Sequence, residues 1–563
     1  MIARPFGERA LFLRLGRHPS PALTARLAAL AEELASASIP GLVEVVPGHT
    51  TLLLHFRPEE TDHETLARRV REVAVSREGG RPGPGPVRGP TCHLLPVVYG
   101  GEGGPDLEKV AGESGLRPEE VVRQHSSPLY SVSCFGFAPG FAYLGELPPP
   151  LRLPRRGQAR DRVPRGAVGI AGPHTGVYPG GTPGGWHLIG WTPAEVYSPG
   201  EEERALFRVG DEVRFVPVPE WKGGEVKSDH RQGGAAGESP AGEGVPFLRI
   251  LHPGVLASFQ DGGREGYRAE GVAPLGPADV FSFHALCRLL GNSPRDAAVE
   301  VLLFGFSAEV LSPGLIAVTG ADLGATLNGR ELPLWQVVEV KPGDRITFSS
   351  PRRGMRAYLG VAGGFSAPRV LGSASYDPLL GMIPLRPGEV LLKKEAPLSP
   401  PPRPGQRWPP ELEPAIYREI TVRVTLGPEA GSFPREALGL LFSSSFRVSP
   451  RSDRRGLRLE GPRLPGPKGD RPSEGVVSGT LQVTPSGEAL LLLEGSQTTG
   501  GYPVLAVAIE PDLCLLAQAR PGEAEVRFRY VSLEEARASS LEFRSRLRFA
   551  TLEPVPSPPA TSR

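Results

Sequence analysis

A glycine-rich stretch in the first half of the chain carries side chains that could bind a ligand. Residues 175–190 read TGVYPGGTPGGWHLIG, with Tyr178, Trp186 and His187 set among glycines and prolines. Glycine lets a backbone turn back and present N–H groups to an anion, and proline limits how far such a loop collapses. We therefore expect one wall of a pocket, with Trp186 as its floor and His187 as the titratable group. The alternative is a set of hairpin corners with an ordinary surface or core histidine.

Part of this pattern occurs again near the C-terminus. Residues 499–503 (TGGYP) repeat the Thr-Gly-x-Tyr-Pro of residues 175–179, and Gln497 precedes the second copy. We expect the two copies, through Tyr178 and Tyr502, to meet around one hollow shared by two modules. Both tyrosine rings could instead serve only to pack a core.

Acidic residues at turns are the candidates for catalysis. Asp322 follows an apolar strand in TGAD, Asp453 and Arg454 lie in SDRRG, and Glu474 lies in PSEG. The end of a strand is a usual place for a working side chain, and Asp322 is expected to face the same cavity as His187. Aspartate is equally common as a turn former, and a solvated ion pair contributes about 1 kcal/mol or less. The predicted catalytic residues are His187, Asp322, Asp453, Arg454 and Glu474.

Further residues are predicted to bind a substrate or a nucleotide. Arg156 ends the segment PRR, and an arginine can grip phosphate or carboxylate with two hydrogen bonds. Asp261 and Arg264 lie in QDGGREGY, another glycine turn. Either segment could equally be a solvated loop. The predicted binding residues are Arg156, Tyr178, Trp186, Asp261, Arg264, Gln497 and Tyr502.

Composition and missing motifs exclude several classes of protein. The formal charge is +1, from 63 basic and 62 acidic residues, so no net field attracts nucleic acid or an anionic membrane. No Gly-Lys dipeptide, no Gly-x-Ser-x-Gly and no methionine beside a lysine occurs, which excludes a P-loop, the usual hydrolase serine and covalent biotin. The four cysteines lie far apart and match neither a disulfide framework nor a CxxC metal site, so no resident metal site is predicted from them. Without a signal peptide or an apolar run of about 18 residues, the expected location is the cytoplasm.

The residues above must be positioned mainly by β-structure. Gly (72) and Pro (64) punctuate short apolar runs, which is typical of many strands joined by tight turns. The N-terminus differs, because a strand at 9–16 and a hairpin at 43–56 alternate with helices that begin at Ser20 and Asp62. The sequence thus predicts a mainly β protein with a small α+β unit at its start.

Breaks in hydrophobicity at 79–90, 222–245 and 396–414 divide the chain. Similar closing phrases end in Phe215, Phe348 and Phe528, which predicts three related β-barrel modules. The predicted organisation is an α+β domain (1–85), a β-barrel (91–220), a linker (221–246), a second barrel module (247–400), a third (415–535), and a C-terminal helix and tail (536–563).

Several long motifs resemble two partner families. Residues 130–147 (YSVSCFGFAPGFAYLGEL) and 163–190 are similar to the KipI family, also labelled allophanate hydrolase subunit 1. Residues 259–267 (FQDGGREGY), 319–335 and 497–503 are similar to its partner KipA, labelled subunit 2. The resemblance covers nearly the whole chain and implies cyclophilin-like β-barrels in two halves, which the segment 222–245 fuses.

The resemblance implies three alternative roles. They are the B and C components of an ATP-dependent 5-oxoprolinase that works with a separate A-type subunit, a carboxyltransferase component with a separate biotin carrier, and a regulator that binds a sensor histidine kinase. The first is the main prediction. It implies ATP and Mg²⁺, shared with the partner, with Asp322 or Asp453 on Mg²⁺, arginines near Arg156 on phosphate, and His187 moving protons. Homo-oligomerisation is left open.

The label allophanate hydrolase does not fit the residues. True allophanate hydrolases resemble amidases, in which a Gly/Ser-rich loop carries a serine nucleophile and a lysine. The serine cluster 443–445 lies between two phenylalanines without such glycines. We therefore expect a different, small-molecule reaction.

Overall fold

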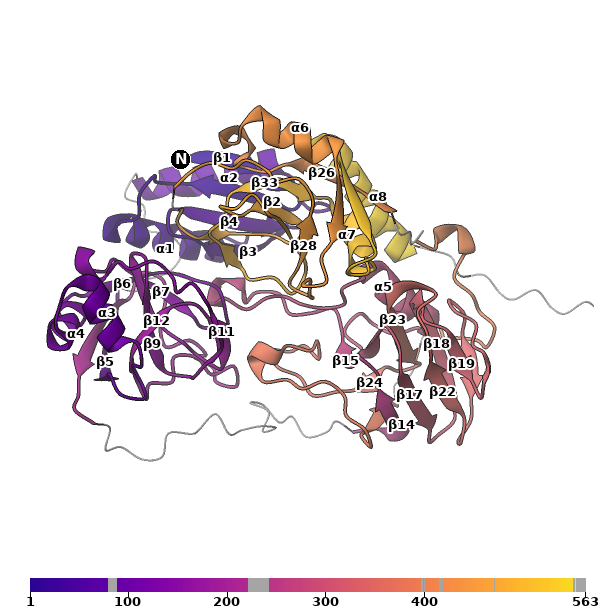
Figure 1. Cartoon of the computed structure of the whole chain (residues 1–563). Helices are drawn as coiled ribbons and strands as arrows, with labels where there is room; N and C mark the ends of the chain where they lie inside the picture. Colours follow the sequence, from indigo (N-terminus) through magenta and orange to yellow (C-terminus); the bar gives the residue numbers. More distant parts are fainter. Residues whose placement is uncertain are drawn as a thin grey trace, which may run out of the picture.

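The computed structural model describes residues 1–78, 89–220, 243–395, 398, 400–414, 419–469, 471–549 and 552. Most of the predicted linker at 221–246 and of the predicted tail lies outside these residues. In Figure 1 the N-terminal domain and the C-terminal barrel lie side by side at the top, with the first barrel below on the left and the second module below on the right. None of the helices in these ranges is long and apolar enough to cross a membrane.

The N-terminal domain is the predicted α+β unit. Its antiparallel sheet has the order β1 (Ile2–Pro5), β2 (Ala10–Arg14), β4 (Thr51–Phe56), β3 (Leu42–Pro47), and it carries helices α1 (Pro21–Ser36) and α2 (His63–Glu78). Both predicted helix caps are confirmed: Ser20 Oγ accepts from the backbone N of Leu23 at 3.2 Å, and Asp62 Oδ1 from that of Thr65 at 2.8 Å. The sequence did not predict β1, the edge strand.

The first barrel is closed by seven strands. In order around the barrel they are β5 (Cys92–Tyr99), β12 (His187–Trp191), β9 (Ala167–Ala171), β10 (His174–Val177), β7 (Ala142–Gly145), β6 (Tyr130–Phe135) and β13 (Glu212–Pro217). The strands β8 (Arg160–Val163) and β11 (Thr182–Gly184) form a separate two-stranded sheet, and helices α3 (Leu107–Ser114) and α4 (Pro118–Ser126) pack outside the barrel. Strands β5 and β13, first and last in the barrel, pair in parallel.

The C-terminal barrel has the same topology, strand for strand. Its order is β26 (Glu419–Leu426), β33 (Val504–Ala508), β30 (Thr480–Val483), β31 (Ala489–Leu492), β28 (Gly456–Glu460), β27 (Ser445–Val448) and β34 (Glu525–Tyr530), with β26 and β34 parallel. The pair β29 (Glu474–Gly475) with β32 (Thr499–Gly500) takes the place of β8 with β11. Helices α6 (Arg435–Ser443), α7 (Glu510–Ala517) and α8 (Leu533–Phe549) complete this part of the chain. The relation that the closing phrases predicted between these two modules is confirmed.

The shared topology corrects the motif match made from the sequence. Because β32 corresponds to β11, the stretch at 499–502 corresponds to 182–186, and the counterpart of Tyr502 is Trp186. Tyr178 follows β10 instead. The two Thr-Gly-x-Tyr-Pro copies therefore occupy different positions in their barrels.

The second module differs from the barrel that the sequence predicts. It consists of two sheets, one of seven strands and one of five. The first has the order β20 (Arg330–Glu331), β19 (Ala325–Leu327), β22 (Arg345–Phe348), β17 (Phe306–Val310), β14 (Val245–Pro253), β25 (Val390–Lys393), β24 (Phe365–Ser366). The second has the order β15 (Leu256–Gln260), β16 (Ala298–Leu302), β23 (Arg353–Val361), β18 (Gly314–Asp322), β21 (Val338–Val340), and α5 (Val280–Leu290) packs on it.

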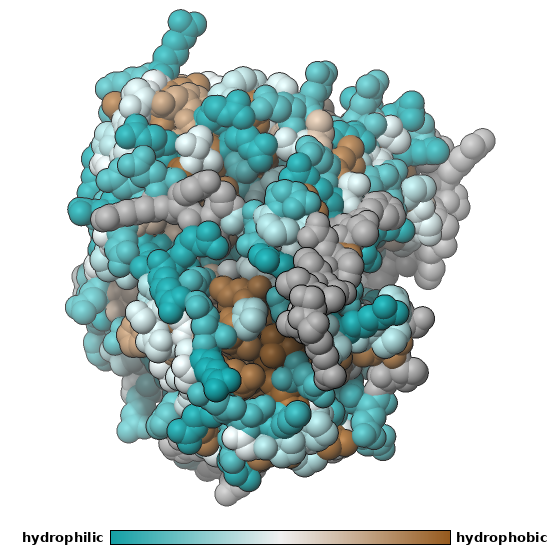
Figure 2. Space-filling model, turned by 90° about the vertical axis from the view of Figure 1, so that its right-hand side faces the viewer, coloured by the Kyte–Doolittle hydropathy of each residue, from teal (hydrophilic) through white to brown (hydrophobic). Residues whose placement is uncertain are grey.

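Two observations follow for this module. The phrase ending in Phe348 forms β21 and β22 inside the module and does not close it, so its likeness to the other two phrases reports only a local turn. Figure 2 shows the molecule from the right-hand side of Figure 1. On this face, apolar residues gather in the middle of the lower half and are surrounded by hydrophilic residues.

The N-terminal sheet packs directly against the C-terminal barrel. Phe12 and Leu53 on the sheet and Phe6, which follows β1, are buried in one cluster with Val504 and Val507 of the barrel. Burying apolar surface of this kind stabilises an interface by about 25 cal/mol per Å². The first and last parts of the chain therefore form one body.

Candidate functional site

A small cavity lies at the junction of the N-terminal sheet and the C-terminal barrel. Its volume is about 90 Å³. It is lined by Phe6, Phe12, Arg14, Arg17 and Thr50 of the N-terminal domain and by Pro428, Glu429, Arg471, Pro472, Glu474, Gly475, Val476, Gly500, Gly501, Tyr502 and Val504 of the C-terminal barrel. We call it the junction cavity. Since a water molecule needs ~10–15 Å³ of such volume, a small organic molecule has room there.

Local backbone features bring the charged residues to this cavity. Arg14 is the last residue of β2, and the pairing of β29 with β32 sets Glu474 opposite Gly500. Gly48, in the turn between β3 and β4, lets the Glu474 segment approach, because a Cβ at Gly48 would lie 3.0 Å from the Cα of Glu474. A side chain at Gly48 would push the two domains apart.

Two carboxylates share one guanidinium in the cavity wall. Arg14 Nη2 donates to Glu474 Oε1 at 2.8 Å and to Glu429 Oε1 at 3.4 Å. Glu429 also accepts from Arg471 and, through Oε2, from the backbone N of Val504 at 3.2 Å. Glu429 thus takes most of the donors, and its negative charge is well compensated.

Glu474 is the carboxyl with fewer partners. Within the described ranges no donor bonds its Oε2, although its side chain is only 14% exposed. Burial, followed by the neighbouring Glu429, raises the pKa of Glu474 to about 7, against the opposing effect of Arg14 and Arg471. Near neutral pH this group can hold or release a proton, as general acid–base chemistry requires.

Arg17 is a free cation at the edge of the same cavity. It is exposed, and in the part of the chain that the structure describes it forms no ion pair or hydrogen bond. A guanidinium in this state can bind a carboxylate or phosphate through two hydrogen bonds. The cavity therefore offers both an anion-binding group and a proton-carrying group.

A buried histidine pair lies directly behind the Glu474 segment. His49 Nδ1 lies 3.0 Å from the carbonyl oxygen of Ser473 and 3.4 Å from Cys134 Sγ. The ring of His49 lies 4.6 Å from the ring of His174, measured between centroids, and Tyr143 packs against both. These residues come from the N-terminal domain, the first barrel and the C-terminal barrel, so three modules meet at this point.

Burial keeps this group neutral. It lowers the pKa of His49, and burial together with His49 lowers that of His174 to about 3. It also raises the pKa of the Cys134 thiol, so Cys134 is not an activated nucleophile. His49 Nε2 and His174 Nδ1 are buried and have no hydrogen-bond partner among the residues that the structure describes. The pair supports the wall of the junction cavity and carries no charge at neutral pH.

A larger, open groove of about 780 Å³ lies between α1 and the first barrel. Seven carboxylates line it, from Glu32, Glu195, Glu201, Glu202, Glu203, Asp211 and Glu270, against the two guanidiniums of Arg204 and Arg208. We call it the acidic groove. An excess of negative charge disfavours a triphosphate there.

Two of the sequence-predicted site residues line the junction cavity, namely Glu474 and Tyr502. Gln497 is exposed and does not line it. Asp453 accepts from the backbone N of Arg455 at 2.8 Å and so forms a turn. Arg454 reaches across to the second module, where it pairs with the buried Glu300.

The predicted residues of the glycine-rich stretch are buried within the first barrel module, where Tyr178 and Trp186 belong to an aromatic cluster separate from the barrel core. Tyr178 and Trp186 each pack against Phe141 with ring centroids 5.2 Å apart. His187 is buried, and its Nε2 lies 2.9 Å from the carbonyl oxygen of Pro154. The nearby glycines make room for these rings, since a Cβ at Gly184 would lie 2.6 Å from the hydroxyl of Tyr178. The expectation that Tyr178 and Tyr502 share one hollow is therefore wrong.

Arg156, also in the first barrel, is engaged by a carboxylate of the protein itself. Its Nη1 lies 2.6 Å from Oδ1 of the buried Asp106, which Arg160 contacts at 2.9 Å. One carboxylate thus faces two guanidiniums in this cluster, and the predicted contact of Arg156 with phosphate stays a prediction.

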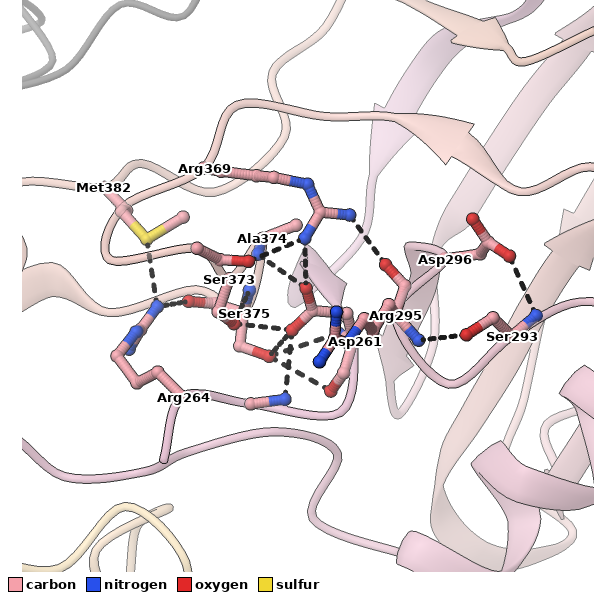
Figure 3. A network of polar contacts seen from close by, with 12 residues as sticks. Asp261, Arg264, Ser293, Arg295, Asp296, Arg369, Ser373, Ala374, Ser375 and Met382 are labelled. Carbon is pink, nitrogen blue, oxygen red and sulfur yellow. Dashed lines mark hydrogen bonds and ion pairs between the residues drawn. The ribbon is translucent and has the colours of Figure 1, made fainter. Parts of the chain in front are cut away.

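Asp261 and Arg264 belong to one buried network in the second module (Figure 3). Asp261 accepts from Arg369 at 2.9 Å and from the backbone N of Ala374 at 2.8 Å. Arg264 Nη2 donates to the carbonyl oxygen of Ser375 at 2.6 Å. The two side chains face the protein interior, where they hold the loop around Ser375 in place.

Asp322 caps a turn at the end of β18. Its Oδ1 accepts from the backbone N of Gly324 at 3.0 Å, and Oδ2 lies 3.8 Å from Arg352. Neither Asp322 nor His187 lines the junction cavity or the acidic groove, so these two cavities do not bring them together. Among the described residues, no three histidine, cysteine, aspartate or glutamate side chains gather closely enough to bind a metal ion.

Sequence reasoning missed Arg14, Arg17, Glu429, Arg471 and the histidine pair. Arg14 reads as an ordinary strand residue, and Glu429 as part of a turn. The only local signal was the position of Glu474 in a proline and glycine turn. The partners lie up to 460 residues apart in the chain, so spacing could not reveal them.

The chain matches two family models. Residues 1–207 match the carboxyltransferase domain, subdomains C and D, and residues 270–530 match the carboxyltransferase domain, subdomains A and B. The two matches correspond to the two sides of the segment that the sequence predicts to be a linker.

Similar proteins divide along the same line. The N-terminal part is 42% identical over 214 residues to the B component of 5-oxoprolinase from Escherichia coli O157:H7, a match that covers 38% of this chain and 94% of that protein. The C-terminal part is 34% identical over 296 residues to the C component of 5-oxoprolinase from Escherichia coli K12, covering 52% of this chain and 93% of that protein. This chain is also similar to the protein in the crystal structure of TTHA0988, with 36% sequence identity and a TM-score of 0.81. The match covers 93% of this chain and 100% of the chain of TTHA0988.

Proposed function

This chain belongs to the carboxyltransferase-domain family that includes the B and C components of 5-oxoprolinase, and because it joins both kinds in one polypeptide, we propose that it is the fused B/C component of an ATP-dependent 5-oxoprolinase. In this proposal the enzyme also needs a separate A-type subunit, and it hydrolyses the lactam of 5-oxo-L-proline to L-glutamate. Its four free cysteines fit a reducing cytoplasm.

One observation carries the proposal: the junction cavity needs both halves. Arg14 and Arg17 come from the half similar to the B component, whereas Glu429, Arg471 and Glu474 come from the half similar to the C component. A site divided in this way explains why the two halves act together. Its size and its charged groups suit a small carboxylate-bearing substrate.

We place ATP and Mg²⁺ outside the junction cavity. A lactam is a poor electrophile, and phosphorylation of its oxygen by ATP supplies the activation that water attack needs. The cavity of about 90 Å³ is far smaller than the ~300–1,000 Å³ of sites for larger ligands, and the acidic groove repels phosphates. Since neither of these two cavities suits ATP, we assign ATP to the A-type subunit or to the place where that subunit meets this chain.

Reconstitution tests the proposed function. The purified chain is mixed with the A-type subunit, ATP, Mg²⁺ and 5-oxo-L-proline, and glutamate and phosphate are measured. Glutamate that forms only in the complete mixture supports the proposal. The variant Arg69→Met, which changes an exposed arginine on α2, is the matched control and should behave as the wild type.

Carboxyl transfer is the second candidate, favoured by the description of both family models. Here the complete mixture yields no glutamate, and the chain instead speeds the loss of carboxyl from a carboxylated biotin carrier. If it neither makes glutamate nor transfers carboxyl, but suppresses autophosphorylation of a sensor histidine kinase, the regulator that the sequence left open is the function.

A further inference from the structure

We propose that the junction cavity recognises a cyclic amide bearing one carboxylate, with Arg17 on the carboxylate and Glu474, in its neutral form, donating a hydrogen bond to the ring carbonyl oxygen. This inference rests on the proposed function for the choice of ligand. It assigns roles within the cavity that the function alone does not give.

The first argument is the unequal distribution of donors. Arg14 lies between Glu429 and Glu474, but Arg471 and the backbone N of Val504 both serve Glu429. The negative charge is therefore best held on Glu429. Two carboxyl groups that share one guanidinium at this depth favour one charge and one proton, and the proton falls to Glu474.

The second argument is the free side of Glu474. Its Oε2 has no donor within the described ranges, and the residue lines the cavity. A carboxylic acid kept neutral by its surroundings can donate a hydrogen bond to a ligand carbonyl. The charged groups that face Glu474 are Arg14, Arg471 and Glu429, and the pKa near 7 agrees with this arrangement.

The third argument concerns the cavity-lining groups that would contact the rest of the ligand. Arg17 is the cavity-lining arginine without a partner within the described ranges, so a ligand carboxylate need not break an existing ion pair. Phe6, Phe12 and Val504 supply apolar walls against which the methylene groups of a small ring can pack. The cavity thus offers one cation, one proton donor and an apolar surface.

Binding should take up a proton at alkaline pH. Above neutral pH Glu474 loses its proton in the free protein, and a ligand that accepts a hydrogen bond from the neutral acid restores it. The apparent affinity therefore falls as the pH rises from 7 to 9. This linkage does not require ATP or turnover.

Calorimetric titration of 5-oxo-L-proline, with the full chain and with its complex with the A-type subunit, tests the proposal without ATP. At pH 8, buffers of different ionisation heat should reveal proton uptake by the wild type. Glu474→Gln keeps a donor, so it should bind without proton uptake and with an affinity independent of pH. Glu474→Ala should lose most of the binding.

The carboxylate is tested with a matched pair of ligands. Arg17→Met should weaken the binding of 5-oxo-L-proline by about tenfold or more. It should leave the affinity for 2-pyrrolidinone, which lacks the carboxylate, unchanged. Arg69→Met should leave the binding of both ligands unchanged, and thermal unfolding checks that each variant is folded.

Three results would overturn the inference, and the first two are patterns of binding. One is equal binding by the wild type, Glu474→Ala and Arg17→Met; the other is binding by the wild type without proton uptake. If either result is obtained while glutamate still forms in the reconstituted mixture, this assignment fails and the proposed function stands. If the linkage appears but no glutamate forms, the proposed function fails and the ligand class stands. Absence of any binding to both the chain and the complex overturns the inference as well.

Discussion

Arg14 Nη2 lies 2.8 Å from Glu474 Oε1, although 460 positions separate the two residues in the chain. The contact joins the last residue of β2 to the first residue of β29, across the interface of two domains. Arg9 with Glu510 at 3.2 Å and Arg544 with Glu59 at 2.8 Å span the same interface. The junction cavity exists only while this interface is closed.

Separate halves of the chain should reassemble. When residues 1–220 and 243–563 are produced as two polypeptides, the apolar cluster around Phe12 and Val504 and the ion pairs across the interface remain available. We expect one co-eluting complex in size-exclusion chromatography. The double variant Phe12→Asp, Leu53→Asp should abolish it, because each buried carboxylate would lack a partner. Elution of wild-type halves as two separate species would contradict this prediction.

Glu474→Gln should become relatively more stabilising as the pH rises. The folded protein holds the pKa of Glu474 at about 7, whereas the ordinary pKa of a glutamate is 4.5. Above pH 4.5 Glu474 ionises freely in the unfolded chain but resists ionisation in the folded protein. The free energy of unfolding of the wild type therefore falls by up to about 3 kcal/mol between pH 4.5 and 7. Glutamine carries no such loss. Melting temperatures of both proteins at pH 5 and pH 8 measure the difference, with Glu72→Gln, at an exposed position, as the matched control.

His174→Gln should protect the protein against acid. Burial, with His49 beside it, lowers the pKa of His174 from 6.5 to about 3, so its stabilising effect is complete above pH 6.5 and is lost as the pH falls toward 3. At pH 5 the free energy of unfolding of the wild type is lower by about 2 kcal/mol because this histidine resists protonation in the folded protein. The melting temperature of the variant, relative to the wild type, should rise from pH 7.5 to pH 5. If the difference in melting temperature between the variant and the wild type is the same at both pH values, His174 does not resist protonation.

Arg264→Met should destabilise the second module without changing ligand binding. The Arg264 side chain is fully buried and lies 3.4 Å from Asp377, and removal of one partner of such a pair costs about 3–5 kcal/mol. Calorimetric titration should still detect binding of 5-oxo-L-proline with the wild-type affinity. A selective loss of ligand affinity with normal melting behaviour would restore the binding role that the sequence predicts for Arg264. Arg345→Met, on the exposed surface of the same module, is the matched control.

Local signals in the sequence were sufficient for the elements of the fold. Ser20 and Asp62 identify the starts of α1 and α2, because a helix cap involves side chains and backbone groups only three residues apart. The turns before β13 and β34 also involve only neighbouring residues, and their similar sequences predicted the relation between the two closed barrels. The second module resisted this reasoning, because whether strands close a barrel or pack as two sheets depends on pairing between distant residues.

The site depended on the tertiary structure. Glu474 could be proposed from its turn, but its raised pKa needs burial and the nearness of Glu429, and neither is visible in PSEG. Trp186 and Tyr178 looked like pocket residues because glycines surround them, yet those glycines make space for the packed rings. Sequence determines which groups a chain carries and which local turns they form. Their charge state and their partners follow from how separate domains pack, since electrostatic interactions depend on distance and burial in space.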